Sequence, residues 1–207
     1  MGLKRTYFSK WQSIFTSVVK LYGFILVFFL GIVVKGQEVI KSNTHRIAIS
    51  DTFPTPPENI HRLFYIQRTS NLHTVIYETN YNKDSTINEF EPVKIYWIRY
   101  GNKGEILPLT PVQRKFAYGV NTMLVDKEKK MYKVNLVSFK KLDIYLMPSK
   151  IGKQYHAYVT INGKMSLLTK IFIRIDGGTL FNPNVDYIEV TGKNIVTKHK
   201  VVERFKP

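Results

Sequence analysis

The sequence predicts a mainly β protein, an antiparallel β-sandwich or barrel with one short helical insert. Three observations support this fold class. Short runs rich in Tyr, Phe, Ile, Val and Trp alternate between apolar and polar residues, as half-buried strands do. Turn-forming residues separate these runs at the spacing typical of antiparallel sheets. A single segment carries helix signals, so helices contribute little to the predicted core.

Nine segments have the strand pattern. The clearest is 93–100, where Arg99 falls on the same face as Trp97 because side chains alternate along a strand. Asn162 and Gly163 predict a tight hairpin, since both residues accept positive φ. The predicted strands cover residues 62–68, 73–79, 93–100, 131–139, 142–147, 154–161, 165–175, 187–190 and 195–205.

The helical segment follows residue 109. Thr110 is a good N-cap, Pro111 suits the first helical position, and Gln113 completes a capping box at the third. Gly119 stands where the helix would end, so the segment predicts about two helical turns.

The first residues read as a signal peptide, predicted to span 1–36. A basic start precedes a run of 14 apolar residues, Leu21–Val34. A bilayer-spanning helix needs about 20 such residues, whereas a signal peptide core needs about 7–15. We expect cleavage between Gly36 and Gln37, and therefore an exported protein of the periplasm or cell envelope, or a secreted one.

The alternative is an uncleaved anchor that keeps the protein on the membrane. Residues 13–34 are interrupted only by Lys20, which could extend to the interface. In either case residues 37–58 are expected to be a lead-in linker, because three prolines disfavour helix and central strand. Residues 59–207 are expected to form one β-rich domain.

The chain of 207 residues has no cysteine and a formal net charge of +16. Disulfides, zinc–thiolate sites and thiol nucleophiles are therefore excluded. Five of the 31 basic residues lie in the leader, which leaves 26 against 15 acidic residues, a net charge of +11. Such a surface attracts polyanions. Outside the cytoplasm these are anionic lipids, lipopolysaccharide and acidic glycans, and no nucleic acid is expected. The alternative is that the lysines only confer solubility.

Several segments together resemble a bacterial family, the domain of unknown function numbered 4833. The segments are Phe53-Pro54, Arg62–Arg68, Val93–Tyr100, Gln113–Gly119, Phe139–Leu142 and Glu203–Pro207. The likeness covers nearly all of 53–207. It implies an exported, single-domain protein of Bacteroidetes type, and it implies no particular activity.

Motifs for catalysis or metal binding are missing from the sequence. It has no Gly-rich phosphate loop, no metal-spaced histidine pair and no serine elbow, so no cofactor or metal is expected and any catalytic residue is unknown. The five histidines are widely scattered. Asp176, before two glycines, reads more simply as a turn residue than as a catalytic or calcium-binding carboxylate.

Basic residues recur among aromatic ones, and this pattern gives the candidate ligand-binding set. Arg99 lies on a predicted core face, where it needs a partner or lines a pocket. Planar guanidiniums beside tyrosine hydroxyls suit phosphate, sulfate or carboxylate groups. The simpler alternative is structural ion pairing on an ordinary sheet surface. The candidate residues are Arg62, Tyr65, Arg68, Arg99, Arg114, Lys115, Tyr118 and Lys140.

Three functions fit these observations, and we rank them in this order. The first is non-catalytic binding of an anionic ligand, a glycan or a lipid headgroup, in the cell envelope. The second is a structural or protein-interaction module that uses an exposed sheet edge. The third is a hydrolase or lyase whose acid–base groups are His, Tyr or Asp side chains. The oligomeric state is not predicted.

Overall fold

The computed structural model describes residues 53–69, 71–149, 154–179 and 182–206. The predicted signal peptide, its cleavage site and residues 37–52 of the predicted lead-in lie outside this part of the chain. None of the helices among the described residues is long and apolar enough to cross a bilayer.

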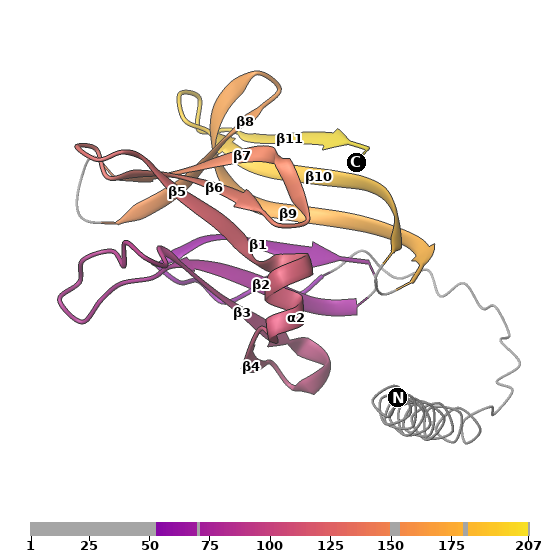
Figure 1. The fold of residues 1–207 in the computed structure, drawn as a ribbon. Helices are drawn as coiled ribbons and strands as arrows, with labels where there is room; N and C mark the ends of the chain where they lie inside the picture. Colours follow the sequence, from indigo (N-terminus) through magenta and orange to yellow (C-terminus); the bar gives the residue numbers. More distant parts are fainter. Residues whose placement is uncertain (1–52, 70, 150–153, 180–181, 207) are drawn as a thin grey trace, which may run out of the picture. The chain divides into compact units, whose positions relative to one another are not determined.

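Strands dominate the described residues and confirm the predicted mainly β class with its short helical insert. They form one sheet with the order β4-β3-β2-β1-β9-β8-β7-β6-β5, and β10 pairs with both β9 and β11. The sheet curls into a half-barrel (Figure 1). The strands are β1 (Arg62–Arg68), β2 (Asn71–Thr79), β3 (Val93–Arg99), β4 (Glu105–Pro108), β5 (Val120–Asp126), β6 (Met131–Leu136), β7 (Phe139–Pro148), β8 (Tyr155–Ile161), β9 (Lys164–Gly178), β10 (Pro183–Asn194) and β11 (Lys200–Phe205).

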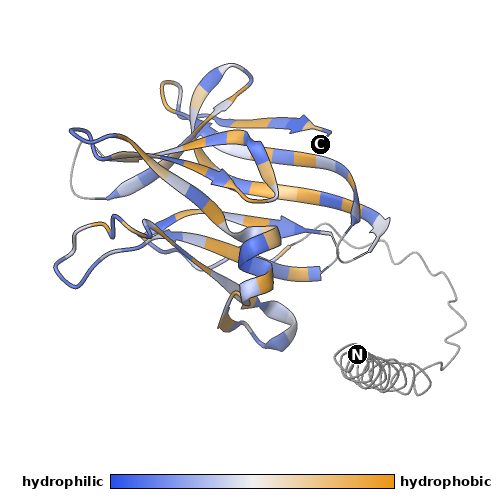
Figure 2. Ribbon diagram, in the orientation of Figure 1, coloured by the Kyte–Doolittle hydropathy of each residue, from blue (hydrophilic) through white to orange (hydrophobic). Residues whose placement is uncertain are grey.

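The core lies on the inner face of the curled sheet. Apolar and polar residues alternate along most strands (Figure 2), and the apolar ones turn inward. Phe64, Tyr77, Ile95, Val134 and Ile144 are at most 3% exposed. They come from both halves of the sheet, so one core joins β1–β3 to β6–β8. Burying each such side chain contributes about 1.5–3 kcal/mol.

One strand pair departs from the predicted antiparallel arrangement. β1 and β9 run parallel, with Tyr65 opposite Lys170 and Arg68 opposite Ile173, while the other pairs are antiparallel. Parallel neighbours need a long connection, and here β2–β8 supply it. The Thr69 hydroxyl closes this junction, because it donates to the Ile175 carbonyl and accepts from the Ile175 amide, both at 2.8 Å.

The predicted hairpin at 162–163 is confirmed, with positive φ at Asn162 (48°) and Gly163 (73°) between β8 and β9. Several strand boundaries differ from the prediction, and two of the differences are large. β6 ends at residue 136, so Phe139 begins the next strand, and β10 extends to Asn194 before a turn leads to β11. Two edge strands, β4 and β5, were not predicted.

The helical insert is also confirmed. It consists of α2 (Pro111–Gln113) followed by a wider π-type turn, η2 (Arg114–Tyr118), after β4 and the short turn η1 (Tyr100–Asn102). Thr110 and Gln113 form the predicted capping box. The helix ends at Gly119, whose backbone is extended, and a Cβ there would lie 1.9 Å from the Arg114 carbonyl oxygen, so no larger residue fits.

The described end of the predicted lead-in packs on the outer face of the sheet. Gln67 Nε2 donates to the Pro54 carbonyl at 2.8 Å. Arg62 Nη1 donates to the Pro57 carbonyl at 2.6 Å. The Phe53 ring meets the Phe172 ring edge-on, with centroids 5.2 Å apart. Residues 53–57 are therefore fixed to β1 and β9.

Candidate functional site

The inner face of β1–β3 changes from apolar to cationic at one end. Cross-strand pairing sets up two apolar rows, and the next position on each strand gives a third. Its members are half-buried, and we call them the inner row. The two apolar rows are Phe64–Tyr77–Ile95 and Ile66–Val75–Trp97. The third consists of Arg68, His73 and Arg99: a register shift after Gln67 places Arg68 opposite Asn71, and the charges of both arginines act on His73. Arg99 thus extends the core face of Trp97, as the alternation predicts.

Aromatic rings hold the Arg68 guanidinium in place. Its Cζ lies 5.9 Å from the Trp97 ring centroid and 5.6 Å from that of Tyr118. Stacking of this kind stabilises the cation without using its N–H donors. The Arg68 Nε is buried and has no hydrogen-bond partner in the described part of the chain. Arg68 is therefore oriented and still able to donate.

His73 lies between the two arginines of the inner row. Its Nδ1 is buried and, within the described residues, has no hydrogen-bond partner. Its ring meets Trp97 edge-on, with centroids 6.2 Å apart. Burial lowers the pKa of His73, and the charges of Arg99 and Arg68 lower it further. The imidazole is accordingly neutral at pH 7 in the free protein.

The inner row has more positive than negative charge around it. Ion pairs in the described ranges involve neither Arg68 nor Arg99. The cross-strand neighbour of Arg99 is Glu105, whose exposed carboxylate accepts from Asn102 Nδ2 at 3.5 Å and is not ion-paired with Arg99. The two guanidiniums thus have no ion-paired carboxylate among the described residues, and an anion could accept charge-assisted hydrogen bonds there.

The helical insert positions the aromatic residues that stack on Arg68. The Gln113 Oε1 that accepts from the Thr110 amide at 3.0 Å also accepts from Trp97 Nε1 at 3.1 Å. The Tyr77 hydroxyl donates to the Tyr118 carbonyl at 2.8 Å. The capping box thus fixes the indole as well as the helix end, and a core tyrosine fixes the other end of the insert.

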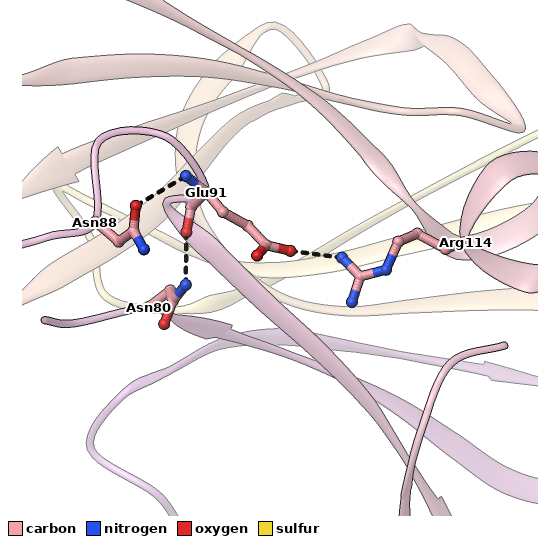
Figure 3. Close-up of polar contacts among 4 residues, drawn as sticks. All are labelled: Asn80, Asn88, Glu91 and Arg114. Atoms are coloured by element: carbon pink, nitrogen blue, oxygen red, sulfur yellow. Dashed lines mark hydrogen bonds and ion pairs between the residues drawn. The ribbon is translucent and has the colours of Figure 1, made fainter. Parts of the chain in front are cut away.

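Arg114 anchors the insert instead of joining the inner row. Its Nη1 lies 2.6 Å from Glu91 Oε1 (Figure 3). The Glu91 backbone is itself held, because Asn80 Nδ2 donates to its carbonyl at 2.8 Å and Asn88 Oδ1 accepts from its amide at 3.1 Å. Since an exposed carboxylate occupies Arg114, this guanidinium has less capacity for a further anion.

Arg62 and Tyr65 lie on the opposite face of β1, in a group that we call the outer cluster. It comprises Arg62, Tyr65, Glu78, Tyr96 and Asn59. Glu78 Oε1 accepts from the Tyr96 hydroxyl at 2.5 Å and from Asn59 Nδ2 at 2.6 Å. Burial and then the Glu78 hydrogen bond raise the pKa of Tyr96. The Arg62 Nη1 donates to two proline carbonyls, so Arg62 is held against the end of the lead-in.

The remaining predicted residues lie apart from the inner row. Lys115 is exposed, with its Nζ 5.2 Å from the Phe116 ring centroid, and Lys140 is exposed at the start of β7. The structure therefore brings together Arg68, Arg99 and Tyr118 of the eight candidates. His73 and Trp97 also belong to this group although they were not among the eight candidates. In the sequence, only their positions in the strand alternation could have indicated this.

Acid–base chemistry finds little support in the described residues. Their histidines make no ion pair with a carboxylate, and Asp176 is exposed near the end of β9. In the same ranges no three His, Asp or Glu side chains are grouped closely enough to hold a metal ion. His45 lies outside the described residues.

A cavity of about 660 Å³ lies elsewhere in the half-barrel, lined by Tyr81, Ile87, Lys129, Met147 and Tyr155, among others. Burial raises the pKa of Tyr155 to about 12, so its hydroxyl stays protonated at neutral pH. The lining mixes one glutamate with two lysines among the apolar groups, and it favours no ligand charge. The inner row has the stronger chemical bias, and we take it as the candidate site.

The fold and this site define a small mainly β domain whose curled sheet carries a cationic row at one end. A family model described as a domain of unknown function (DUF4833) matches residues 64–204, and the chain belongs to this family. The resemblance inferred from the sequence is thereby confirmed. No curated protein and no solved structure is similar enough to the chain to count as a match.

Proposed function

We propose that the protein is an exported cell-envelope protein that binds an anionic group, without catalysis, on the inner row. One observation carries the proposal. Arg68 and His73 each have a buried nitrogen that lacks a partner among the described residues, next to a second arginine without an ion pair. Unpartnered buried polar groups cost stability, about 1–3 kcal/mol each, and an anion that reached these nitrogens as hydrogen-bond acceptor would recover that cost.

The chemistry of the row supports phosphate, sulfate or carboxylate as the recognised group. Arg68 is stacked and presents an N–H edge, which suits a planar or tetrahedral oxyanion. A halide ion would gain less, because a single spherical ion cannot accept two parallel hydrogen bonds from the guanidinium as an oxyanion can. The basic surface of the chain would speed the encounter with an anionic ligand, more so at low ionic strength.

Titration with inorganic sulfate at low salt tests the proposal. The full chain has two tryptophans, so a Trp11→Phe background makes Trp97, which contacts Arg68, the sole fluorescent indole. Arg68→Gln and Arg99→Gln should each weaken sulfate binding by about ten-fold or more, the usual loss for a charge-assisted hydrogen bond.

Lys140→Gln is the matched control, because Lys140 is equally basic but exposed on β7. It should change the affinity by less than about two-fold. Equal losses in all three variants would mean diffuse attraction to surface charge, and no sulfate binding at all would remove the proposal outright.

An interaction module is the second candidate, and one observation favours it. β5 ends the strand order of the sheet, and it exposes Met123 (59%), Leu124 (42%) and Val125 (39%). An edge with consecutive exposed apolar residues invites pairing with another strand. If this is the working surface, the sedimenting mass should rise with concentration, and Leu124→Lys should prevent the rise.

A further inference from the structure

The inner row continues across the sheet as an apolar row. Arg68 pairs with Ile173 on β9, Ile173 pairs with Ile188 on β10, and Ile188 pairs with Phe205 on β11. Cross-strand partners point to the same face of a sheet. The Arg68 side chain is therefore followed across the sheet, on the same face, by three apolar side chains.

Ile188 is buried in the core, but the other two apolar residues of this row are not sealed within it. Ile173 and Phe205 are only partly buried, and so is Phe139, whose ring stacks on Phe205 with centroids 5.4 Å apart. Ile175 and Val185, paired at the next position, are also half-buried. We call these five residues the apolar rim. It retains apolar surface in contact with solvent beside Arg68.

We propose that the ligand of the inner row is an amphiphilic anion, a lipid whose headgroup binds Arg68 and Arg99 while its hydrocarbon chain covers the apolar rim. This inference rests on the proposed function and narrows it. An acidic glycan would cover the rim with hydroxyl groups, and the rim side chains offer those hydroxyls no hydrogen bonds. A hydrocarbon chain instead removes apolar surface from water on both partners.

If this proposal is right, the affinity should increase with the length of the ligand's hydrocarbon chain. Each methylene that leaves water strengthens binding, by about four-fold when it is fully buried. Since the rim residues are half-exposed, the gain per methylene should be smaller, and an eight-carbon chain should still strengthen binding by about ten-fold or more.

Three probes separate the headgroup from the chain: methyl phosphate, octyl phosphate below its micelle concentration, and octyl glucoside, which has the chain without the charge. To the Trp11→Phe protein, octyl phosphate should bind at least about ten-fold more tightly than methyl phosphate. Octyl glucoside should bind more weakly than octyl phosphate, because it lacks the anion.

Matched variants assign the two parts of the ligand. Ile173→Thr should weaken octyl phosphate several-fold and leave methyl phosphate unchanged, whereas Arg99→Gln should weaken both. Val202→Thr is the control, because Val202 is an apolar residue on β11 that is 39% exposed and lies on the other face from Phe205. It should affect neither probe. If the Ile173 variant does not fold, the protein with the unmodified rim provides a second test. Nuclear Overhauser effects between the octyl methylenes and the Ile173 methyl groups should then show that the hydrocarbon chain contacts the rim.

The outcomes separate the two proposals. Equal affinities for methyl and octyl phosphate, both lost in Arg99→Gln, would overturn the amphiphile and leave anion binding in place. Failure of every phosphate probe would remove both. Octyl glucoside binding as tightly as octyl phosphate would overturn the role given to the headgroup.

Discussion

The two faces of β1–β3 carry similar residues in different states. On the outer face, Arg62 donates to two proline carbonyls and Glu78 accepts from Tyr96 and Asn59. On the inner face, an arginine and a histidine each keep a buried nitrogen that nothing in the described chain satisfies. The comparison teaches that basic and aromatic residues alone do not indicate a binding site. What separates the two arginines is that Arg62 donates to protein carbonyls, whereas the Arg68 Nε has no acceptor among the described residues.

Glu78 gives the largest effect expected on stability. Glu78→Ala should lower the free energy of unfolding by about 1–3 kcal/mol, because it leaves the Tyr96 hydroxyl and the Asn59 amide without their acceptor. Sulfate affinity should stay the same. Glu78→Gln keeps an acceptor oxygen and should retain most of the stability. Urea unfolding of the three chains measures the difference, and a loss of sulfate binding in Glu78→Ala would mean that the two faces are coupled.

Gln113 sharpens the comparison, because it acts on the inner face only. Thr110→Ala and Gln113→Ala both remove the capping box, at about 1 kcal/mol each. Gln113→Ala also leaves the Trp97 indole N–H without its acceptor. It should therefore weaken sulfate binding several-fold, while Thr110→Ala should not. Parallel titrations of the two variants check this, and equal affinities would show that the indole does not orient Arg68.

Because of His73, we expect both the stability of the fold and the sulfate affinity of the inner row to depend on pH, which is not expected from the outer cluster. The charged groups around it are Arg68 on β1, Arg99 on β3 and, beyond Arg99, Glu105 on β4. Because its pKa is lowered in the fold, the unfolded chain binds more protons as pH falls below about 6.5. The protein is thus expected to lose stability as the pH falls from about 6.5 to the lowered pKa of His73 in the folded state.

A bound anion favours the protonated imidazole, so sulfate affinity should rise as pH falls from 7.5 to 5.5. Sulfate keeps its charge over this range. His73→Gln should abolish the rise in affinity. It should leave part of the stability loss, because burial also lowers the pKa of His156. An unchanged rise in His73→Gln would place the titrating group elsewhere.

Glu105 gives the smallest effect. Glu105→Gln removes the carboxylate on the residue opposite Arg99 and should tighten sulfate binding by about two-fold, as expected for an exposed charge in high dielectric. Glu128→Gln, an equally exposed change in the β5–β6 turn, is the control. The effect should vanish at high salt, and a weaker affinity in Glu105→Gln would contradict the charge balance assigned to the inner row.

The sequence was informative wherever local physics decided the structure. Alternation located most strands, and the capping residues located the insert before Gly119. β5 escaped prediction because its residues are mostly exposed on both faces, so no alternation marks them. The short β4 contains Pro108 at its end and has little apolar contrast. Both are edge strands, whose formation depends on the partner strand more than on their own residues.

The candidate site was predicted in part for the same reason. Arg99 was noticed because its own strand puts it on a core face. His73 was not, because a single histidine becomes significant only when the folded sheet brings it close to Arg68 and Arg99, and a register shift in β1 that the sequence does not reveal contributes to that placement. Likewise, the commitment of Arg114 to Glu91 depends on a loop that residue types do not place. Partners come from tertiary structure, which local patterns do not contain.

The parallel pairing of β1 with β9 also affects the order in which the strands can pair during folding. Thr69 and Ile175, joined at this junction, stand 106 residues apart in the chain. A polypeptide that emerges with its N-terminus first therefore carries β1–β4 as a meander with an open edge until β9 appears. Such distant closure is slow. A chain truncated before residue 164 should stay aggregation-prone however complete its first half looks, because nothing else can cover that edge.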